Sequence, residues 1–80
     1  MTERLKYEGR LGVEKRKVKA LELKMQGLRD SIRNILDPFE KLELIETDVA
    51  ASQCVELSGL QIELKESLET IRALNKALGR

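Results

Sequence analysis

The sequence contains no histidine and no tryptophan, and it has one cysteine, Cys54, and one proline, Pro38. Without histidine, a serine or cysteine nucleophile lacks its usual base. The single cysteine excludes a disulfide within the chain, and without histidine it also argues against a tetrahedral zinc site. Diiron bundles need Glu-x-x-His pairs, which are absent. We therefore expect no enzymatic activity, no catalytic residue, no metal and no cofactor.

Long hydrophobic runs are absent too. No stretch approaches the roughly 20 apolar residues that cross a bilayer, and the first eight residues lack the apolar core that a secretion signal needs. One unpaired cysteine also fits a reducing compartment. We expect a soluble, cytoplasmic protein that has no membrane partner.

Residues that favour sheets and turns are scarce. Tyr7 and Phe39 are the only aromatic side chains, and Pro38 with five glycines leaves little material for the turns of a β protein. Charged residues make up 36% of the chain, and many of the others are Leu, Ile, Val and Ala, a composition typical of long helices. The sequence therefore predicts an all-α fold, with residues 1–80 as a single domain.

The chain does contain a seven-residue apolar repeat that runs from Leu11 to Leu42. Steps of three and four residues alternate along it, and only Glu14 interrupts the series. Such a repeat is typical of a helix that buries one seam against another helix. One phase consists of Leu11, Val18, Met25, Ile32 and Phe39, and the other of Leu21, Leu28, Ile35 and Leu42.

The sequence predicts an interruption of the repeat at Asp37-Pro38. Asp37 is a candidate N-cap, Pro38 suits the first position of a helix, and Glu40 completes a capping box. Proline also disfavours a helical conformation in the residue before it. We predict one helix over about 3–36 and a second over about 38–78. A continuous helix with a proline kink is the alternative.

The predicted second helix has its own repeat and ends before Gly79, a usual helix stop. A further break at Thr47-Asp48 stays open, because both residue types favour caps. Cys54 is expected to face the core as a small hydrophobic residue. One phase contains Ala50, Leu57, Leu64, Ile71 and Leu78, the other Cys54, Gln61, Leu68 and Asn75, and Leu60 and Leu74 widen the stripe.

Two helices joined by a short connection pack antiparallel, which predicts a helical hairpin. With a tight turn, Leu11 lies opposite Leu64 and Glu14 opposite Gln61. With a longer connection the register shifts by one heptad, and Leu11 faces Ile71. We favour the tight turn, because it pairs one polar seam residue with another.

The apolar surface of both helices is wider than one seam, so a lone hairpin leaves several leucines in water. At roughly 25 cal/mol per Å², that exposure forfeits a few kcal/mol. We therefore predict that two hairpins form a homodimeric four-helix bundle. The predicted seam residues are Leu11, Val18, Leu21, Met25, Leu28, Ile32, Ile35, Leu57, Leu60, Leu64, Leu68, Ile71 and Leu74.

Charge is distributed unevenly between the two arms. Residues 1–36 contain ten basic and five acidic residues, and residues 37–80 contain five basic and nine acidic ones. We expect the basic residues to pair with the acidic arm, within the hairpin or across a dimer. The alternative is an anionic partner such as a nucleic acid. The candidate contacts are Arg10, Lys15, Arg16, Lys17, Lys19 and Lys24.

These observations predict an interaction or assembly protein, an adaptor or regulator that binds through helical seams to itself and to another protein. Short, charged helical chains of this kind are typical of phage-encoded accessory proteins. The acidic face of the second arm, at Glu56, Glu63 and Glu66, is a second candidate contact surface. A protein that binds phosphates through its basic first helix is the alternative function.

Overall fold

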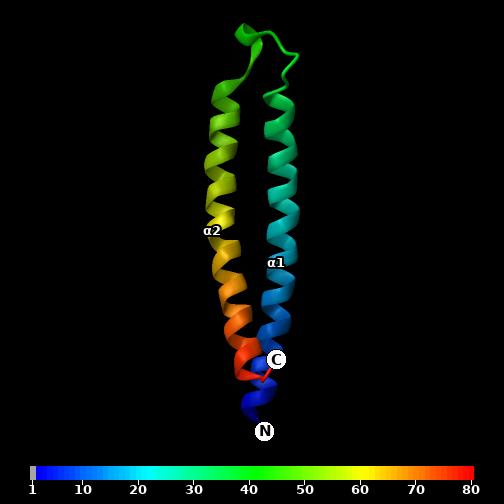
Figure 1. Cartoon of the computed structure of the whole chain (residues 1–80), viewed down its shortest axis with the longest axis vertical. Coiled ribbons are helices and arrows are strands. Elements are labelled where there is room, and N and C mark those ends of the chain that lie inside the picture. The colour runs from blue at the N-terminus through cyan, green and yellow to red at the C-terminus, as the bar shows by residue number, and fades with distance from the viewer. Residues whose placement is uncertain (1) are drawn as a thin grey trace.

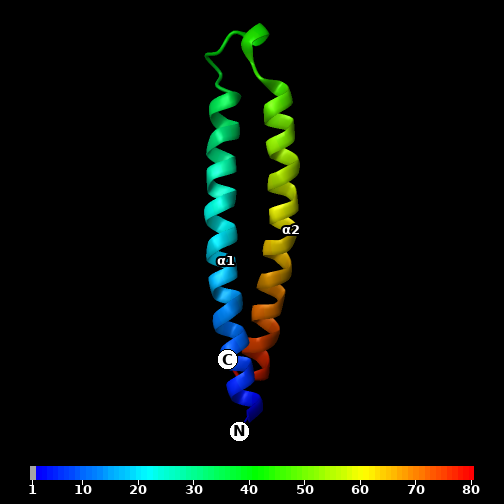
Figure 2. The ribbon, with the colours of Figure 1, turned by 180° about the vertical axis from the view of Figure 1, so that it is seen from behind.

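The computed structural model describes residues 2–80, which form two long helices and a short connection (Figure 1). Helix α1 spans Thr2–Ile35, the 3-10 helix η1 spans Leu42–Leu44, and helix α2 spans Thr47–Ala77. The two long helices run antiparallel and lie side by side in opposite views, with both chain ends at one end (Figures 1 and 2). The Cα atoms fill a rod of 63 × 15 × 14 Å. The prediction of an all-α antiparallel hairpin is confirmed.

Helix α1 ends where proline requires it to end. The amide of Leu36 donates to the carbonyl of Ile32 at 2.9 Å, and Pro38 then has no amide hydrogen to donate. The carboxylate of Asp37 accepts from the amide of Phe39 at 2.9 Å, and its carbonyl accepts from the amide of Glu40 at 3.1 Å. These two bonds close an isolated turn in the connection.

The predicted restart of the helix at Pro38 is wrong, because α2 begins at Thr47. Asp37 does accept a hydrogen bond as a cap would, but the same bond also stabilises a turn. Lys41 and Ile45 are extended, with ψ angles of 136° and 123°, so no helix continues through the connection. The break at Thr47-Asp48 that the sequence left open is therefore the start of the second helix.

The late start of α2 removes two residues from the predicted repeat. Phe39 and Leu42 lie in the connection and are 94% and 88% exposed, whereas the heptad pattern placed them in the seam. The pattern was misleading here because a spacing of seven has structural meaning only while the helix continues.

The helices pack in the register of the longer connection. Leu11 forms a buried cluster with Leu74 and Leu78, and Tyr7 and Ile71 pack against it. The favoured tight-turn register, which placed Leu11 opposite Leu64, is wrong. The connection of residues 36–46 is long enough to shift α2 along α1 relative to that register.

One side of the seam on α2 also differs from the prediction. Leu60, Ser67 and Leu74 turn toward α1, and Cys54 and Leu68 are exposed at the edge. The apolar stripe is three heptad positions wide, but one partner helix covers only two of them. The predicted seam contained Leu60, Leu68 and Leu74, and of these Leu60 is half-buried and Leu74 buried, whereas Leu68 is 36% exposed. The inward residues are Ala50, Gln53, Leu57, Leu60, Leu64, Ser67, Ile71, Leu74 and Leu78.

The C-terminal end of α2 follows the sequence prediction. Gly79 has a φ of +76°, and its amide donates to the carbonyl of Lys76. The amide of Arg80 donates to the carbonyl of Asn75 at 2.8 Å. This double closure is the Schellman motif, in which glycine avoids the penalty that a Cβ atom would incur.

Leu74→Ala tests the buried cluster at this end. Leu74 is 4% exposed, and its truncation should lower the free energy of unfolding by about 2–4 kcal/mol. The matched control is Leu5→Ala, because Leu5 is 70% exposed and should change stability by less than about 0.5 kcal/mol. Urea denaturation followed by circular dichroism measures both. Equal losses in the two variants would contradict this assignment of the core.

Candidate interaction surface

A groove of about 440 Å³ runs between α1 and α2 near the middle of the rod. The half-buried side chains of Met25, Leu57 and Leu64 contribute its apolar part. In a helical bundle, a groove of this kind receives the side chains of a third helix. The lining residues are Glu22, Met25, Gln26, Arg29, Cys54, Leu57, Ser58, Gln61 and Leu64.

The outward side of α2 beside this groove carries no charge, and we call it the uncharged face (Ala51, Cys54, Val55, Ser58, Gly59 and Ile62). Val55 is 75% exposed and Ile62 is 58% exposed, although both are β-branched apolar residues. Gly59 lowers helix propensity, yet a Cβ atom there would meet nothing within 4 Å. The packing of the hairpin itself therefore does not require the small residue.

Sequence reasoning missed this face, although the signal was present. Residues 49–62 contain a single charged residue, Glu56, over almost four helical turns. Ala51, Val55, Ser58 and Ile62 follow steps of four, three and four, which mark one helical face. The stronger seven-residue repeat on the opposite side of the same helix concealed this second periodicity.

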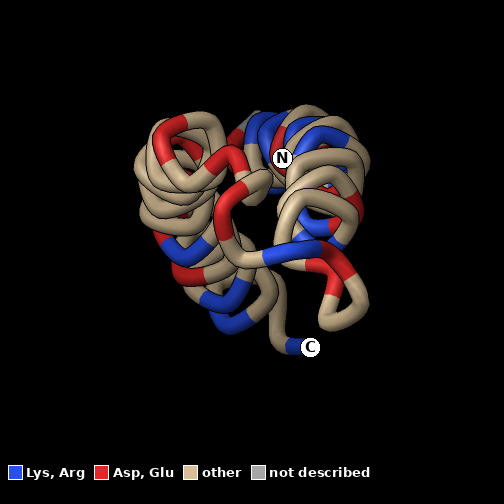
Figure 3. Tube along the Cα trace, turned by 90° about the horizontal axis from the view of Figure 1, so that it is seen from above, with Lys and Arg blue, Asp and Glu red and all other residues tan. Residues whose placement is uncertain are grey.

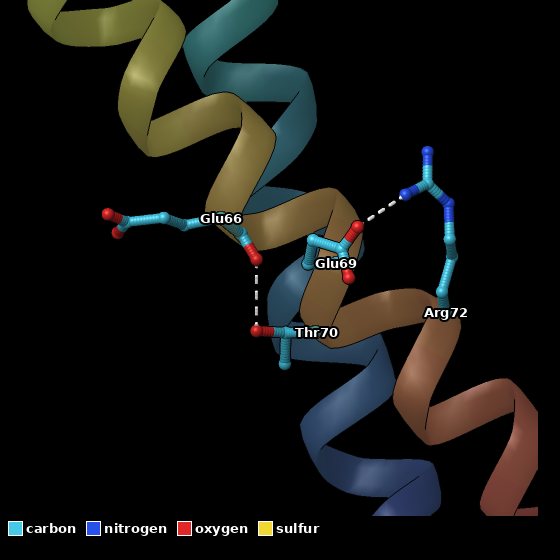
Figure 4. A network of polar contacts seen from close by, with 4 residues as sticks. All are labelled: Glu66, Glu69, Thr70 and Arg72. Carbon is cyan, nitrogen blue, oxygen red and sulfur yellow. Dashed lines mark hydrogen bonds and ion pairs between the residues drawn. The ribbon is translucent and has the colours of Figure 1, made fainter.

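The uncharged face ends where the outward side of α2 becomes charged (Figure 4). Arg72 pairs with Glu69 at 2.7 Å, and both side chains point away from the helix. The hydroxyl of Thr70 donates to the carbonyl of Glu66 at 3.1 Å. The pair of Arg72 and Glu69 is exposed, so it contributes at most about 1 kcal/mol to stability. Its charges mark this part of α2 as a solvated surface.

The connection between the helices forms a second apolar patch, on an acidic background. We call residues 36–48 the tip. Leu36 and Leu44 are exposed there beside the still more exposed Phe39 and Leu42. The same segment contains five acidic residues and one basic residue, Lys41. Figure 3 looks onto this end and shows acidic positions following one another along the connection.

The candidate contact residues of α1, from Arg10 to Lys24, are exposed, and none of these basic residues forms an ion pair within residues 2–80. The pairs in that range are Arg29 with Asp30, Arg72 with Glu69, and Arg80 with Glu8. Only the last joins the two arms of the hairpin, through the residue that follows Gly79 at the end of α2. The expected pairing of the basic residues with the acidic arm is therefore not made inside the hairpin. The basic strip consists of Arg10, Lys15, Arg16, Lys17, Lys19 and Lys24.

Charge is separated along the rod as well as between the two arms. We call residues 2–18 and 67–80 the base half, since Leu11 and Leu74 lie at one level there. It contains nine basic and four acidic residues, a balance of +5. The tip half, residues 19–66, contains six basic and ten acidic residues, a balance of −4. The balance of the tip half equals that of the tip (residues 36–48) alone, which is also −4. The tip lies largely beyond the end of α1 (Figure 1).

Within residues 2–80, no three acidic or cysteine side chains are grouped closely enough to hold a metal ion together. Of the described helices, neither combines the length and the apolar character that crossing a bilayer requires. Comparison of the chain with protein-family models, with curated proteins and with solved structures finds no match.

Three polar side chains in the seam have a buried atom without a hydrogen-bond partner. They are Oε2 of Glu14, Oε1 of Gln53 and Oγ of Ser67. A buried polar atom without a partner costs about 1–3 kcal/mol. Of these three, only Glu14 was placed in the seam by the sequence, whereas Gln61, which was also placed there, is exposed on the groove wall.

Glu14→Leu should therefore stabilise the hairpin. The change removes the unpartnered carboxylate oxygen and continues the leucine repeat, so we expect a gain of about 1–2 kcal/mol. Thermal unfolding at several protein concentrations measures it, with Glu63→Leu at an exposed position outside the groove as the control. A loss of stability would mean that Glu14 has a polar partner that the isolated chain does not supply.

Proposed function

We propose that this chain is a non-catalytic interaction or assembly protein, and that its first partner is a second copy of itself. Two hairpins would then pack as a four-helix bundle. The observation that carries the proposal is the amount of surface that the single hairpin exposes. Its accessible area is 6395 Å², whereas a compact protein of 9.1 kDa exposes about 4,900 Å².

The excess of about 1,500 Å² per chain is more than a stable interface needs. A standard interface takes about 800 Å² from each partner. The elongated shape alone raises the area, but the exposed part includes apolar side chains that such shapes do not require. They are Val55 and Ile62 on the uncharged face and the half-buried Leu57 and Leu64 in the groove, with Cys54 and Ser58 on the rim between the two surfaces.

Burial of this region would continue the packing that the hairpin begins. Side chains at the edge of the seam, such as Cys54 and Gln61, already border the groove. A second helix pair would cover the third heptad position that α1 leaves open. The small residues Ala51, Ser58 and Gly59 would allow a partner helix to approach closely.

Val55→Asp combined with Ile62→Asp separates association from folding. Both residues are exposed in the hairpin, so helicity should stay within a few per cent of the parent protein. A carboxylate in a dry interface is unfavourable, so the mass in solution should fall from twice 9.1 kDa to 9.1 kDa. Sedimentation equilibrium measures the mass.

The matched control carries the same change on the outward side of α1, as Leu5→Asp with Leu23→Asp. Both of those residues are also exposed, and the control protein should keep the mass of the parent. A parent protein that remains a 9.1 kDa particle at all concentrations would contradict the proposed function.

The exposed and unpaired basic strip favours a second candidate function, the binding of nucleic-acid phosphates. Lys15→Glu, Lys17→Glu and Lys19→Glu together should then abolish retention on heparin, and binding of the parent protein should weaken steeply with salt. The control is Lys41→Glu in the tip. Free passage of the parent protein through heparin at low salt would exclude this candidate.

A further inference from the structure

We infer that the second copy docks antiparallel, with the acidic tip of each hairpin beside the basic base half of the other and the two uncharged faces in contact between them. This inference rests on the proposed self-association and adds the orientation and the contact surfaces. Charge complementarity, the position of the uncharged face along the rod and the exposed apolar residues at both ends all support it.

The charge balance of the two halves distinguishes the possible orientations. A parallel pair would place two tip halves of −4 side by side and two base halves of +5 side by side. An antiparallel pair places +5 beside −4 at both ends. Exposed charges contribute little net affinity, but like charges held together disfavour the wrong arrangement. Because the whole chain has a balance of +1, two copies meet with little overall repulsion.

The position of the uncharged face determines which parts of the two ends meet. The middle of that face lies near residue 57, and Thr47 is about 15 Å away along the helix. A twofold axis at residue 57 therefore places the start of one α2 beside residue 67 of the other. The tip extends further and reaches the level of Leu74, which packs with Leu11. The same level carries the basic strip from Arg10 to Lys17.

The antiparallel arrangement also brings exposed apolar residues of the two copies together. Phe39 and Leu42 in the tip have no cover within the hairpin. The part of the other copy that they reach contains Leu68, which is also exposed. Burial of these three residues adds an apolar contact at each end of the dimer. End-to-end stacking of the rods would bring unlike charges together as well, but it would leave the uncharged faces in water.

Charge reversal at either end tests the orientation. The first variant carries Glu40→Lys, Glu43→Lys and Glu46→Lys, and the second carries Lys15→Glu, Arg16→Glu and Lys17→Glu. In an antiparallel dimer each variant brings like charges together, so self-association should weaken about tenfold. An equimolar mixture should recover to within about threefold of the parent protein, because its unlike ends match again.

A parallel dimer gives the opposite result, since each reversal removes repulsion between identical ends. Self-association would then become tighter in both single variants, and this outcome would overturn the inference. Sedimentation equilibrium at low salt measures the constants, and circular dichroism checks that both variants keep the helicity of the parent. A mass that rises beyond two copies would indicate end-to-end stacking and would also overturn it.

A distance measurement gives an independent readout that does not depend on charge. Leu42→Cys in a Cys54→Ser background places one spin label on each tip without changing the charge. The antiparallel dimer separates the two labels by about 30 Å or more, because each tip lies at least ten residues from the axis. Tips that lie side by side would give about 20 Å or less, and that result would reject the antiparallel arrangement.

The same experiments separate this inference from the proposed function. A parent protein that stays monomeric contradicts both the proposed self-association and the antiparallel orientation. If the parent protein is a dimer, the charge variants associate more tightly and the spin labels lie close together, the proposed function stands. Only the antiparallel orientation is then wrong.

Discussion

A helix that packs against one other helix can bury only a limited width of its surface. In this protein the apolar stripe of α2 spans three heptad positions, and α1 covers two of them. The third, at Cys54, Gln61 and Leu68, remains at the edge of the seam and continues into the groove and the uncharged face. Most of the structure follows from this mismatch between a wide stripe and a single partner helix. It explains the thin core, the excess surface and the proposal of a second copy.

The seam is best packed at one end of the rod and incomplete elsewhere. Leu11, Leu74 and Leu78 form the buried cluster near the chain ends, whereas Met25, Leu57 and Leu64 in the middle stay half-buried. Unpartnered polar atoms on Glu14 and Ser67 weaken the seam further. Chains of this size rarely obtain enough stability from one core. Folding and association are therefore expected to support each other, because the same apolar side chains contribute to both.

The connection places the acidic excess of the sequence at one end of the rod and leaves the basic excess toward the other end. If α2 had begun at Pro38 in the tight-turn register, the acidic residues from Glu40 to Glu46 would have lain near Arg29 and Arg33 of α1. The turn at Asp37 and the extended residues Lys41 and Ile45 instead carry the acidic segment beyond the end of α1. The basic strip also has no ion-pair partner within residues 2–80. Opposite charges are then available to another molecule, and a second copy of this chain offers the matching set.

The sequence alone determined the helical fold, the end of the first helix at Asp37-Pro38 and the end of the second at Gly79. Each follows from a local rule: periodicity, the missing amide of proline and the left-handed φ of glycine. The tertiary structure alone decided the start at Thr47, the longer register and the exposure of Cys54 and Leu68 at the edge of the seam. Those features depend on how two helices share a limited contact area. Local patterns cannot settle that competition, because capping residues also make turns and a wide apolar stripe permits more than one seam.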